Sequence, residues 1–493
     1  MKRFLSLGSH MKTGMWCLVF FLVVMAWSSA RAEEPVYAMK GHMQTNFAWL
    51  PEIIQHVPPL QHERGQRWPM ILWEVGPFEP QPVATYRALL ARGLTQHIQL
   101  DTNHIPVAQA LQAAGSPVIM MQGAGGPWPA QLAGDPKEWA HQFVPGYKPA
   151  GYARPCLTIY KGWAIEADNV RTILRRFKEA GVTVDAVWMD WEGDPMFAED
   201  AYDQARHCTR CQATLPPAVL ATREGFDMYR TRLVADLLAT YLVAPVREVF
   251  PKCETTNWAI TLSTPENPVT GWNDQLKPPT VPALFSATNP IAYGNTVYWG
   301  SWNKKWPVDR EHVDQFYFHL LIRMVSVDRA NVARWAPYLR CFPWVARWCP
   351  DDEDPKIPIM SRERYREVLR HLWLRGVDGM QIFQPRRPGF EDISLSEVQD
   401  AVAIYDEMLA NRELLEAGTP LSYAVPQPQD DGIVWSGMRL GERAVVRTFK
   451  PGGGQSRIKI EPWPGKTVQL NATPVGQTYR LRLANGQVVV EKE

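Results

Sequence analysis

The sequence predicts a (β/α)8 barrel followed by a small all-β module, and two patterns support this prediction. Between residues 70 and 415, eight short apolar runs alternate with amphipathic helical segments. After about residue 418 the helical segments stop, and short strand-like runs follow one another with turn residues between them. We therefore expect a signal peptide at 1–32, a barrel domain at 33–417 and a β-sandwich module at 418–493.

The eight expected barrel strands are apolar runs that lie at 70–76, 97–101, 117–126, 184–192, 256–262, 289–295, 338–347 and 377–385. The segments between them have the 3.6-residue apolar period of helices. The helix expected at 361–376 begins at the N-cap Ser361 and ends at Gly376. Two long insertions, at 127–162 and 193–217, follow the third and fourth strands and are expected to shape a cleft.

The N-terminus has the pattern of an export signal. Basic residues precede an apolar run from Trp16 to Trp27, which is too short to cross a bilayer comfortably. Ala30 and Ala32 then form an A-x-A cleavage pattern. We expect a mature chain that is secreted or periplasmic, with no membrane-spanning segment after cleavage.

Charge and glycine patterns exclude several function classes. The chain has 52 basic and 51 acidic residues, and the signal contains four basic residues and no acids, which leaves a net charge of −3. This balance provides no basic surface for nucleic acid. The glycine-rich stretch at 123–128 has no helix directly behind it, so it is a weak signal for nucleotide binding. We expect no cofactor.

Six cysteines follow the signal: Cys156, Cys208, Cys211, Cys253, Cys341 and Cys349. An even number in an exported protein favours disulfides, and we expect at least two. The stretch 207–211, HCTRC, also has the spacing of half a zinc site. A structural zinc needs four ligands, however, and no second close cluster is evident. Disulfide or simple structural use is therefore favoured, and no metal ligand is expected.

The fourth strand ends in two acids. Asp190 and Glu192 share the face of Trp188, because side chains alternate along a strand. In a barrel this face points inward, and active sites lie at the C-terminal ends of the strands. Burial and mutual repulsion raise the pKa of one of two neighbouring carboxyl groups. We interpret Glu192 as the proton donor and Asp190 as its partner; the alternative is a structural carboxylate pair held by arginines at the barrel rim.

Aromatic residues are dense near the predicted strand ends. Flat rings with a polar edge suit the faces of sugars, although core packing is the commoner role of any single tryptophan. We therefore expect a carbohydrate substrate. The residues expected to contact it are Trp73, Trp258, Trp299 and Trp344, together with Asp101 after the second strand.

The stretch DAVWMDWE at 185–192 resembles the D-x-x-D-x-D-x-E signature of glycoside hydrolase family 18, the chitinases. Asp185, Asp190 and Glu192 match in register. Trp188 stands in place of the middle aspartate, which resembles the hyaluronidase-type barrels of family 56. NPIAYGN at 289–295 is similar to the sixth strand of these families, and GVDGMQIF, from 376 onward, to their eighth.

This resemblance implies a glycoside hydrolase in which the 2-acetamido oxygen of the sugar attacks the anomeric carbon. Glu192 would act as general acid and then as base, and Asp190 would hold the acetamido N–H. Tyr293 would also hold that group, and Phe383 would stand where these families have a pocket tryptophan. The implied substrate is a polysaccharide or oligosaccharide that contains N-acetylhexosamine.

Two alternatives remain open. VWMD at 187–190 also resembles the W-x-D fourth strand of retaining α-glycosidases, in which the aspartate is the nucleophile. A second acid would then come from Glu74, Asp101, Glu266 or Asp378. The other alternative is a carbohydrate-binding barrel without activity. The C-terminal module either binds a ligand or caps the barrel, and capping is favoured.

Overall fold

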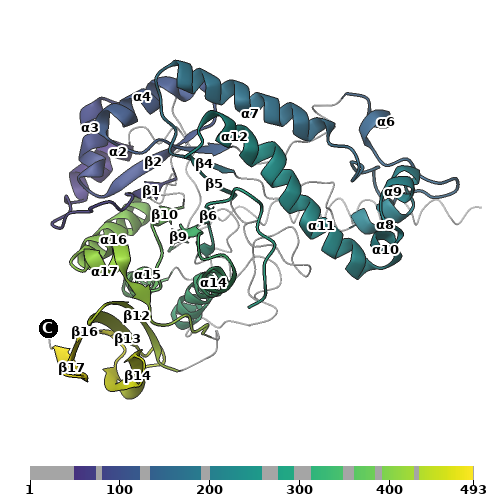
Figure 1. Cartoon of the computed structure of the whole chain (residues 1–493). Helices are drawn as coiled ribbons and strands as arrows, with labels where there is room; N and C mark the ends of the chain where they lie inside the picture. Colours follow the sequence, from purple (N-terminus) through teal and green to yellow (C-terminus); the bar gives the residue numbers. More distant parts are fainter. Residues whose placement is uncertain are drawn as a thin grey trace, which may run out of the picture.

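The chain forms a parallel β-barrel surrounded by helices, and the last part of the chain forms a small antiparallel module (Figure 1). The computed structural model describes residues 49–73, 80–122, 134–189, 200–257, 276–293, 313–347, 360–383, 391–426 and 432–491. The predicted fold class is confirmed in both of its parts. The expected signal peptide lies outside the described residues.

Eight barrel strands follow one another along the chain. The first five are β1 (Met70–Leu72), β2 (Leu94–Gln99), β3 (Ile119–Gln122), β4 (Ala186–Met189) and β5 (Glu254–Asn257). The sixth consists of β6 (Ala287–Thr288) and β7 (Ile291–Tyr293), the seventh of β8 (Arg340–Cys341) and β9 (Trp344–Ala346), and the eighth is β10 (Gln381–Ile382). Pro290 and Pro343 lie in the two interruptions, where proline has no N–H to donate to a neighbouring strand.

The strands pair in parallel in the order β5-β4-β3-β2-β1-β10-β9-β7. The ring closes between the fifth and sixth strands, where the Ser286 amide donates to the Thr255 carbonyl at 2.9 Å. The Thr255 amide in turn donates to Ser286 Oγ, also at 2.9 Å. Strands buried on both faces are near-continuous apolar runs, which is why the sequence shows them. β2 begins earlier than predicted, because Thr95 and Gln96 interrupt its apolar pattern.

The helices that surround the barrel are α2 (Trp49–His56), α3 (Val83–Leu90), α4 (Ile105–Ala114), α7 (Lys161–Glu179), α11 (Arg223–Leu237), α12 (Ala244–Val249), α14 (Val313–Trp335), α15 (Arg362–Trp373), α16 (Glu391–Leu409) and α17 (Arg412–Ala417). The π-helical segment η4 (Leu238–Val243) joins α11 to α12, and the short 3-10 helix η2 (Thr102–His104) precedes α4. Ser361 caps α15 as predicted, since its hydroxyl accepts from the Arg364 amide. Among the described helices, none combines the length and apolar character needed to span a membrane.

Gly376 follows α15 and shows why glycine stands at that position. Its φ of +79° lies in the left-handed region, and a Cβ there would approach Pro420 Cγ to 2.6 Å. The close approach brings the end of α15 against β11 (Thr419–Pro420), the first strand of the C-terminal module.

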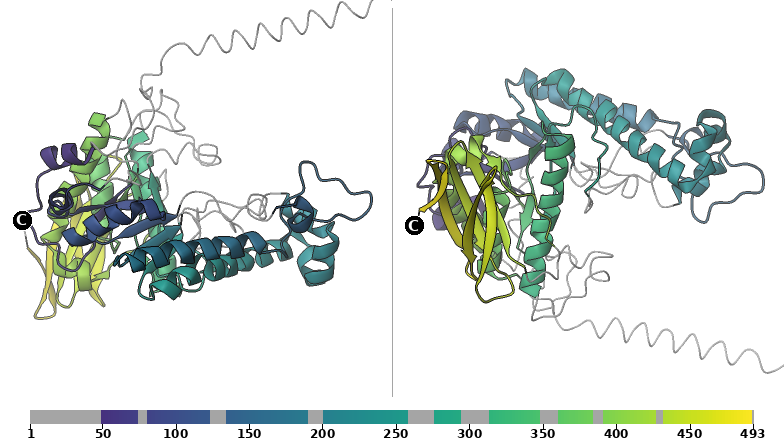
Figure 2. Two further views of the ribbon diagram at one scale, coloured as in Figure 1. Left: turned by 90° about the horizontal axis from the view of Figure 1, so that it is seen from above. Right: turned by 60° about the horizontal axis from the view of Figure 1, so that its bottom comes forward.

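A helical extension projects from the barrel. It contains α6 (Pro136–Trp139), α8 (Ala201–Arg206), α9 (Thr209–Thr214) and α10 (Pro217–Ala221). Figures 1 and 2 show these short helices gathered at the far end of the long helices α7 and α11. Helix α6 belongs to the predicted insertion after β3, and helices α8 and α9 belong to the predicted insertion after β4. Helix α10 begins where the second insertion ends.

The C-terminal module contains two antiparallel sheets. The larger has the order β11-β12-β13-β16-β17, and the smaller pairs β14 with β15. Their strands are β12 (Val434–Leu440), β13 (Arg443–Phe449), β14 (Ser456–Trp463), β15 (Lys466–Ala472), β16 (Gln477–Ala484) and β17 (Gln487–Glu491). Six buried apolar residues from both sheets form a small core of their own: Ala444, Val446, Ile460, Trp463, Leu470 and Leu481.

A buried polar network joins this module to the barrel. The Arg447 guanidinium of β13 donates two hydrogen bonds to the Glu367 carboxylate of α15, at 2.8 and 2.6 Å. Burial disfavours the charged form of Glu367, but hydrogen bonds from His371 and Arg447 outweigh it and lower the pKa of Glu367 to about 2. Ser436 of β12 contacts His371 at 2.8 Å and accepts from Arg375 at 2.9 Å.

Candidate active site

The fourth barrel strand directs its inward-facing side chains toward the barrel axis. β4 pairs with β3 and β5, and all four of its residues are buried. The Trp188 ring centroid lies 5.4 Å from that of His97 on β2 and 5.2 Å from that of Phe342 in the seventh strand. Trp188 therefore points inward, as the alternation predicts. Asp190 and Glu192 follow β4 directly in the sequence but lie outside the described residues.

Five ring side chains from five different barrel strands form an aromatic floor across the barrel: Trp73, His97, Trp188, Trp344 and Phe383. The rings of Trp73 and Trp344 lie 5.1 Å apart, and Phe383 lies 5.7 Å from Trp344. Trp73 and Phe383 directly follow β1 and β10, and both are half-buried, whereas the other three rings are buried. The sequence-predicted residues Trp73, Trp344 and Phe383 are thus brought together.

Hydrogen bonds around the seventh strand hold this floor in place. The Phe342 carbonyl, next to Pro343, accepts from the buried side-chain amides of Asn289 at 3.0 Å and Gln381 at 2.9 Å. Trp344 follows directly and donates its own amide to the Pro290 carbonyl at 2.9 Å. The interruption in the strand is therefore a fixed bend rather than a loose end.

His97 is a member of the floor that the sequence analysis missed. Its side chain is fully buried, and neither ring nitrogen has a hydrogen-bond partner within the described part of the chain. Burial lowers the pKa of His97 to about 3, so the imidazole is neutral at physiological pH. Buried polar groups are almost always paired, so His97 is a candidate partner for a group above the floor. The sequence feature that could have identified His97 was its position on the inward-facing side of the second barrel strand.

Three described acids next to the barrel strands have structural partners. Asp101 follows β2, and its Oδ1 accepts from the Asn103 amide at 2.8 Å as the cap of the short helix η2. Asp185 stands at the start of β4 and accepts from the Val118 amide at 2.8 Å. Asp378 precedes β10 and accepts from the Cys341 amide at 2.8 Å, which places it at the N-terminal end of the barrel. Barrel chemistry takes place at the opposite end.

The remaining predicted contacts are Trp258, Trp299 and Tyr293. Trp258 and Trp299 lie outside the described residues. Tyr293 is the last residue of β7 and so stands at the C-terminal end of the sixth strand. That is the end of the barrel that also carries Trp73 and Phe383.

No disulfide forms among the described cysteines, so the expected pairing is not borne out in that part of the chain. The five described cysteines are all unpaired and buried; they are Cys156, Cys208, Cys211, Cys253 and Cys341. Cys349 lies outside the described residues. Three of the thiols instead gather in the helical extension, where Cys156 Sγ lies 3.9 Å from Cys208 Sγ and 3.6 Å from Cys211 Sγ. These distances are well beyond the roughly 2.05 Å of a disulfide bond.

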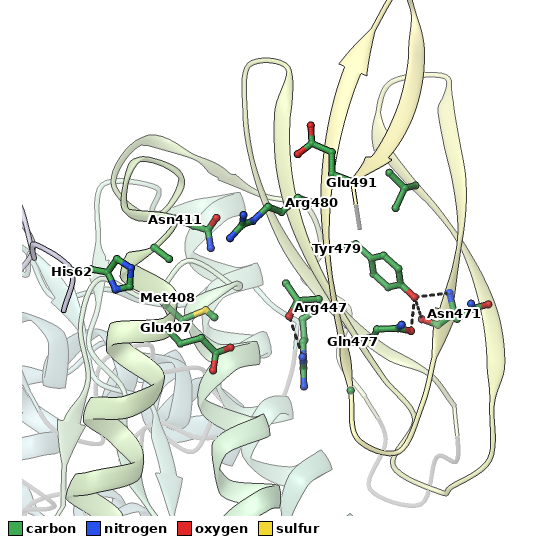
Figure 3. Close-up of a pocket in the computed structure, with 14 residues that line it drawn as sticks. His62, Glu407, Met408, Asn411, Arg447, Asn471, Gln477, Tyr479, Arg480 and Glu491 are labelled. Atoms are coloured by element: carbon green, nitrogen blue, oxygen red, sulfur yellow. Dashed lines mark hydrogen bonds between the residues drawn. The ribbon is translucent and has the colours of Figure 1, made fainter. Parts of the chain in front are cut away.

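A groove of about 830 Å³ lies between α16 and the sheet of the C-terminal module (Figure 3). Glu407, Arg447 and Arg480 are among its mostly polar lining residues. The Tyr479 hydroxyl in this groove donates to Gln477 Oε1 at 2.6 Å and accepts from the Asn471 amide at 3.2 Å. None of the lining residues belongs to the aromatic floor, so the groove is separate from the candidate active site.

No protein-family model matches this sequence, and no curated protein matches it. Among solved structures, the chain is similar to a GH36 α-galactosidase from Geobacillus stearothermophilus, with 11% identity and a TM-score of 0.45. That match covers 86% of this chain and 56% of the other, so the chain spans little more than half of that enzyme's length.

Two further matches have similar scores. A GH30 endoxylanase from Clostridium papyrosolvens is 9% identical, with a TM-score of 0.38 and coverage of 85% of this chain and 96% of the other. An α-amylase from Anoxybacillus is 11% identical, with a TM-score of 0.41 and coverage of 86% and 100%. Similarity at this level does not indicate which reaction this chain catalyses.

Proposed function

We propose that this chain is an exported glycoside hydrolase in which Glu192 acts as general acid and base and Asp190 as its partner. The observation that carries the proposal is the inward-facing Trp188 of β4, which belongs to the aromatic floor. The two acids follow β4 directly in the sequence, and barrel active sites lie at the C-terminal ends of the strands.

The aromatic floor supports both the sugar substrate and the role of Glu192 as an acid. Its half-buried edge, formed by Trp73 and Phe383, offers flat apolar rings of the kind that pack against sugar faces. Its centre holds neutral His97 and buried indole rings. A carboxyl group above such a surface loses hydration, which raises its pKa and favours the protonated acid that a leaving group needs.

For the substrate we propose an oligosaccharide or polysaccharide with N-acetylhexosamine units, on the strength of the D-W-E motif at 190–192. The acetamido oxygen attacks the anomeric carbon while Glu192 donates its proton to the departing glycosidic oxygen. Glu192 then takes a proton from the water that opens the cyclic intermediate. Asp190 accepts a hydrogen bond from the acetamido N–H and orients the acetamido group in both steps.

The two-carboxylate alternative, with Asp190 as nucleophile, lacks a well-placed second acid in the described part of the barrel. Asp378 lies at the wrong end, and Asp101 caps a helix. Glu74 and Glu266 lie outside the described residues. A thiazoline mimic of the cyclised intermediate should therefore inhibit strongly, and a fluorosugar should leave Asp190 unlabelled. Covalent labelling of Asp190 would replace the proposed mechanism with the alternative.

Hydrolysis by the purified chain tests the activity itself. Aryl N-acetylglucosaminides and aryl hexosides should be offered in parallel to the natural chain and to the double variant Asp190→Asn, Glu192→Gln. We expect turnover of the acetamido substrate only by the natural chain. Sugar binding without turnover of any substrate would indicate instead a binding barrel that has no activity.

Export is proposed from the pattern at 1–32. Expression of the full chain in a host with a secretory pathway should yield a mature protein whose N-terminal residue is Glu33. A chain that keeps its N-terminus and stays in the cytoplasm would contradict this part of the proposal.

A further inference from the structure

The helical extension contains a cluster of metal-ligating side chains that is separate from the candidate active site. His141, Cys156, Cys208 and Cys211 are all buried, and their ligand atoms lie within 4.8 Å of one another. In the sequence these residues fall into two pairs from the two insertions. The first pair comes from the insertion after β3 and the second from the insertion after β4.

Backbone pairing brings the four residues together. Ala140, beside His141, forms an antiparallel bridge with Pro155, beside Cys156. Phe143 forms a second antiparallel bridge with Cys208 itself. The segment around 140–143 therefore lies between the other two segments, which places the ligands of one insertion against those of the other.

The C-x-x-C pair occupies the start of a helix. Cys208 is the N-terminal cap residue of α9, and Cys211 lies in its first turn. This arrangement turns both thiols to the same side, since residues three apart on a helix are neighbours. Two cysteines at this spacing are the half-site that structural zinc sites commonly use.

The distances within the cluster fit one tetrahedral zinc ion. With Zn–S bonds of about 2.3 Å, two sulfurs on the same tetrahedral ion lie about 3.8 Å apart. The observed Sγ–Sγ distances from Cys156 are 3.9 Å to Cys208 and 3.6 Å to Cys211. A sulfur and an imidazole nitrogen on such an ion lie about 3.6 Å apart. Cys211 Sγ and His141 Nδ1 are 3.6 Å apart.

We propose that His141, Cys156, Cys208 and Cys211 bind one structural Zn²⁺ that crosslinks the two insertions. Three thiolates and one imidazole in a tetrahedron are a ligand set that selects zinc among common divalent ions. Four protein ligands leave no open position for water or substrate, so the ion stabilises the fold and takes no part in catalysis. This inference does not depend on the proposed glycosidase activity.

The extension also buries apolar residues around the ligands. Leu157, Ala205 and Leu215 are buried with the three thiols in the main hydrophobic core, and Trp139 and Ala140 form a small separate cluster beside His141. A bound metal would add a crosslink between the two insertions to this packing. Since the two insertions follow β3 and β4 in the chain, zinc would hold together the segments that come after these two neighbouring strands.

Metal analysis of the purified full chain tests the proposal. We expect about one zinc per chain without added metal. Cys208→Ser should lower zinc affinity by at least the roughly 10- to 100-fold that loss of an outer-shell partner costs. Cys253→Ala is the matched control, because Cys253 is equally buried but lies outside the cluster, and it should keep its zinc. Zinc loss in both variants, or in neither, would overturn the assignment.

Cobalt substitution provides a readout that does not require any variant to fold. Refolding or exchange of the natural chain with Co²⁺ should produce thiolate-to-cobalt charge-transfer bands and the visible bands of a tetrahedral ion. Chelation should abolish those bands and expose the segment 134–217 to limited proteolysis. A metal-free natural chain with a disulfide among Cys156, Cys208 and Cys211, or with three free thiols and an intact extension, would refute the proposal.

Discussion

The barrel interior and the helical extension place aromatic and sulfur side chains in compact clusters for different physical reasons. In the barrel, five rings from five strands pack at centroid distances of 5.1 to 5.9 Å, and hydrophobic burial stabilises them without further help. In the extension, three thiols and an imidazole have their ligand atoms within 4.8 Å of one another. The first cluster consists of rings in mutual contact, whereas the second brings together ligand atoms whose spacing fits one ion.

The comparison separates two proposals, a substrate site at the aromatic floor and a stabilising zinc site at the thiols. The aromatic floor includes Trp188 of β4, and the proposed catalytic acids follow that strand in the sequence. The helical extension, which contains the thiol cluster, lies at the far end of α7 and α11, away from the barrel strands (Figure 1). Changes in the two regions should therefore affect different measurements.

The largest effect is expected at Glu192. A positioned general acid contributes about 10²- to 10⁴-fold to the rate, so Glu192→Gln should lose most hydrolytic activity. Its zinc content and thermal unfolding should match those of the natural chain. Glu179→Gln, at an exposed position in α7, is the control and should keep full activity. If Glu192→Gln also lost its zinc, the two regions would not be separate.

The next effect concerns the contact between the barrel and the C-terminal module. Arg447→Met should destabilise the fold by about 3–5 kcal/mol, because it leaves the buried Glu367 carboxylate without its main partner. Chemical denaturation would measure this loss. Arg443→Met, which removes an exposed ion pair with Glu413, should leave the free energy of unfolding almost unchanged.

The buried ion pair between Arg447 and Glu367 also has a defined pH dependence. The folded state lowers the pKa of Glu367 from 4.5 to about 2. Its contribution to stability is therefore complete above about pH 4.5 and is lost as the pH falls toward 2. The natural chain should lose stability across this window, and Arg447→Met should show a smaller loss. Equal acid sensitivity of both proteins would contradict this assignment.

A smaller effect is expected at the edge of the aromatic floor. Trp73 is half-buried, so Trp73→Ala should weaken sugar binding more than it disturbs the core. Loss of one stacking ring should raise KM by about tenfold, which corresponds to about 1.4 kcal/mol. Trp73→Phe should recover most of that loss. A change in kcat alone would show that the ring does not bind substrate.

The smallest effect is expected in the pH profile of a His97 variant. Because the pKa of His97 is about 3, the imidazole does not change charge between pH 5 and 8. His97→Gln should therefore keep the shape of the pH–rate profile in that range, even if its activity falls. A shift of either limb of the profile would show that His97 titrates during catalysis.

The sequence predicted the barrel well because most of its strands are short apolar runs that alternate with amphipathic helices. Strand β4 and the acids after it could be recognised because an apolar run that ends in two carboxylates is uncommon. The start of β2 was missed because Thr95 and Gln96 resemble a turn, although both are buried. His97 was missed for a similar reason, since nothing in the local pattern shows that a strand histidine lies among tryptophans.

The thiol cluster shows where local patterns are insufficient. Cys208 and Cys211 could be identified as half of a zinc site from their spacing alone. The other half, His141 and Cys156, is not a local motif, and the bridge between Ala140 and Pro155 brings it together. The prediction of disulfides followed from the number of cysteines, which contains no information about which segments become neighbours in the fold.

The dependence of the Glu192→Gln rate on the leaving group tests the central claim, that Glu192 protonates the glycosidic oxygen at the mouth of the barrel. A series of aryl N-acetylglucosaminides with phenols of increasing acidity should be hydrolysed by the natural chain and by Glu192→Gln. Acidic phenols depart without a proton, so we predict that the variant loses little activity on them and most of its activity on weakly acidic phenols. An equal loss across the series, or no loss, would contradict the role of Glu192 as general acid.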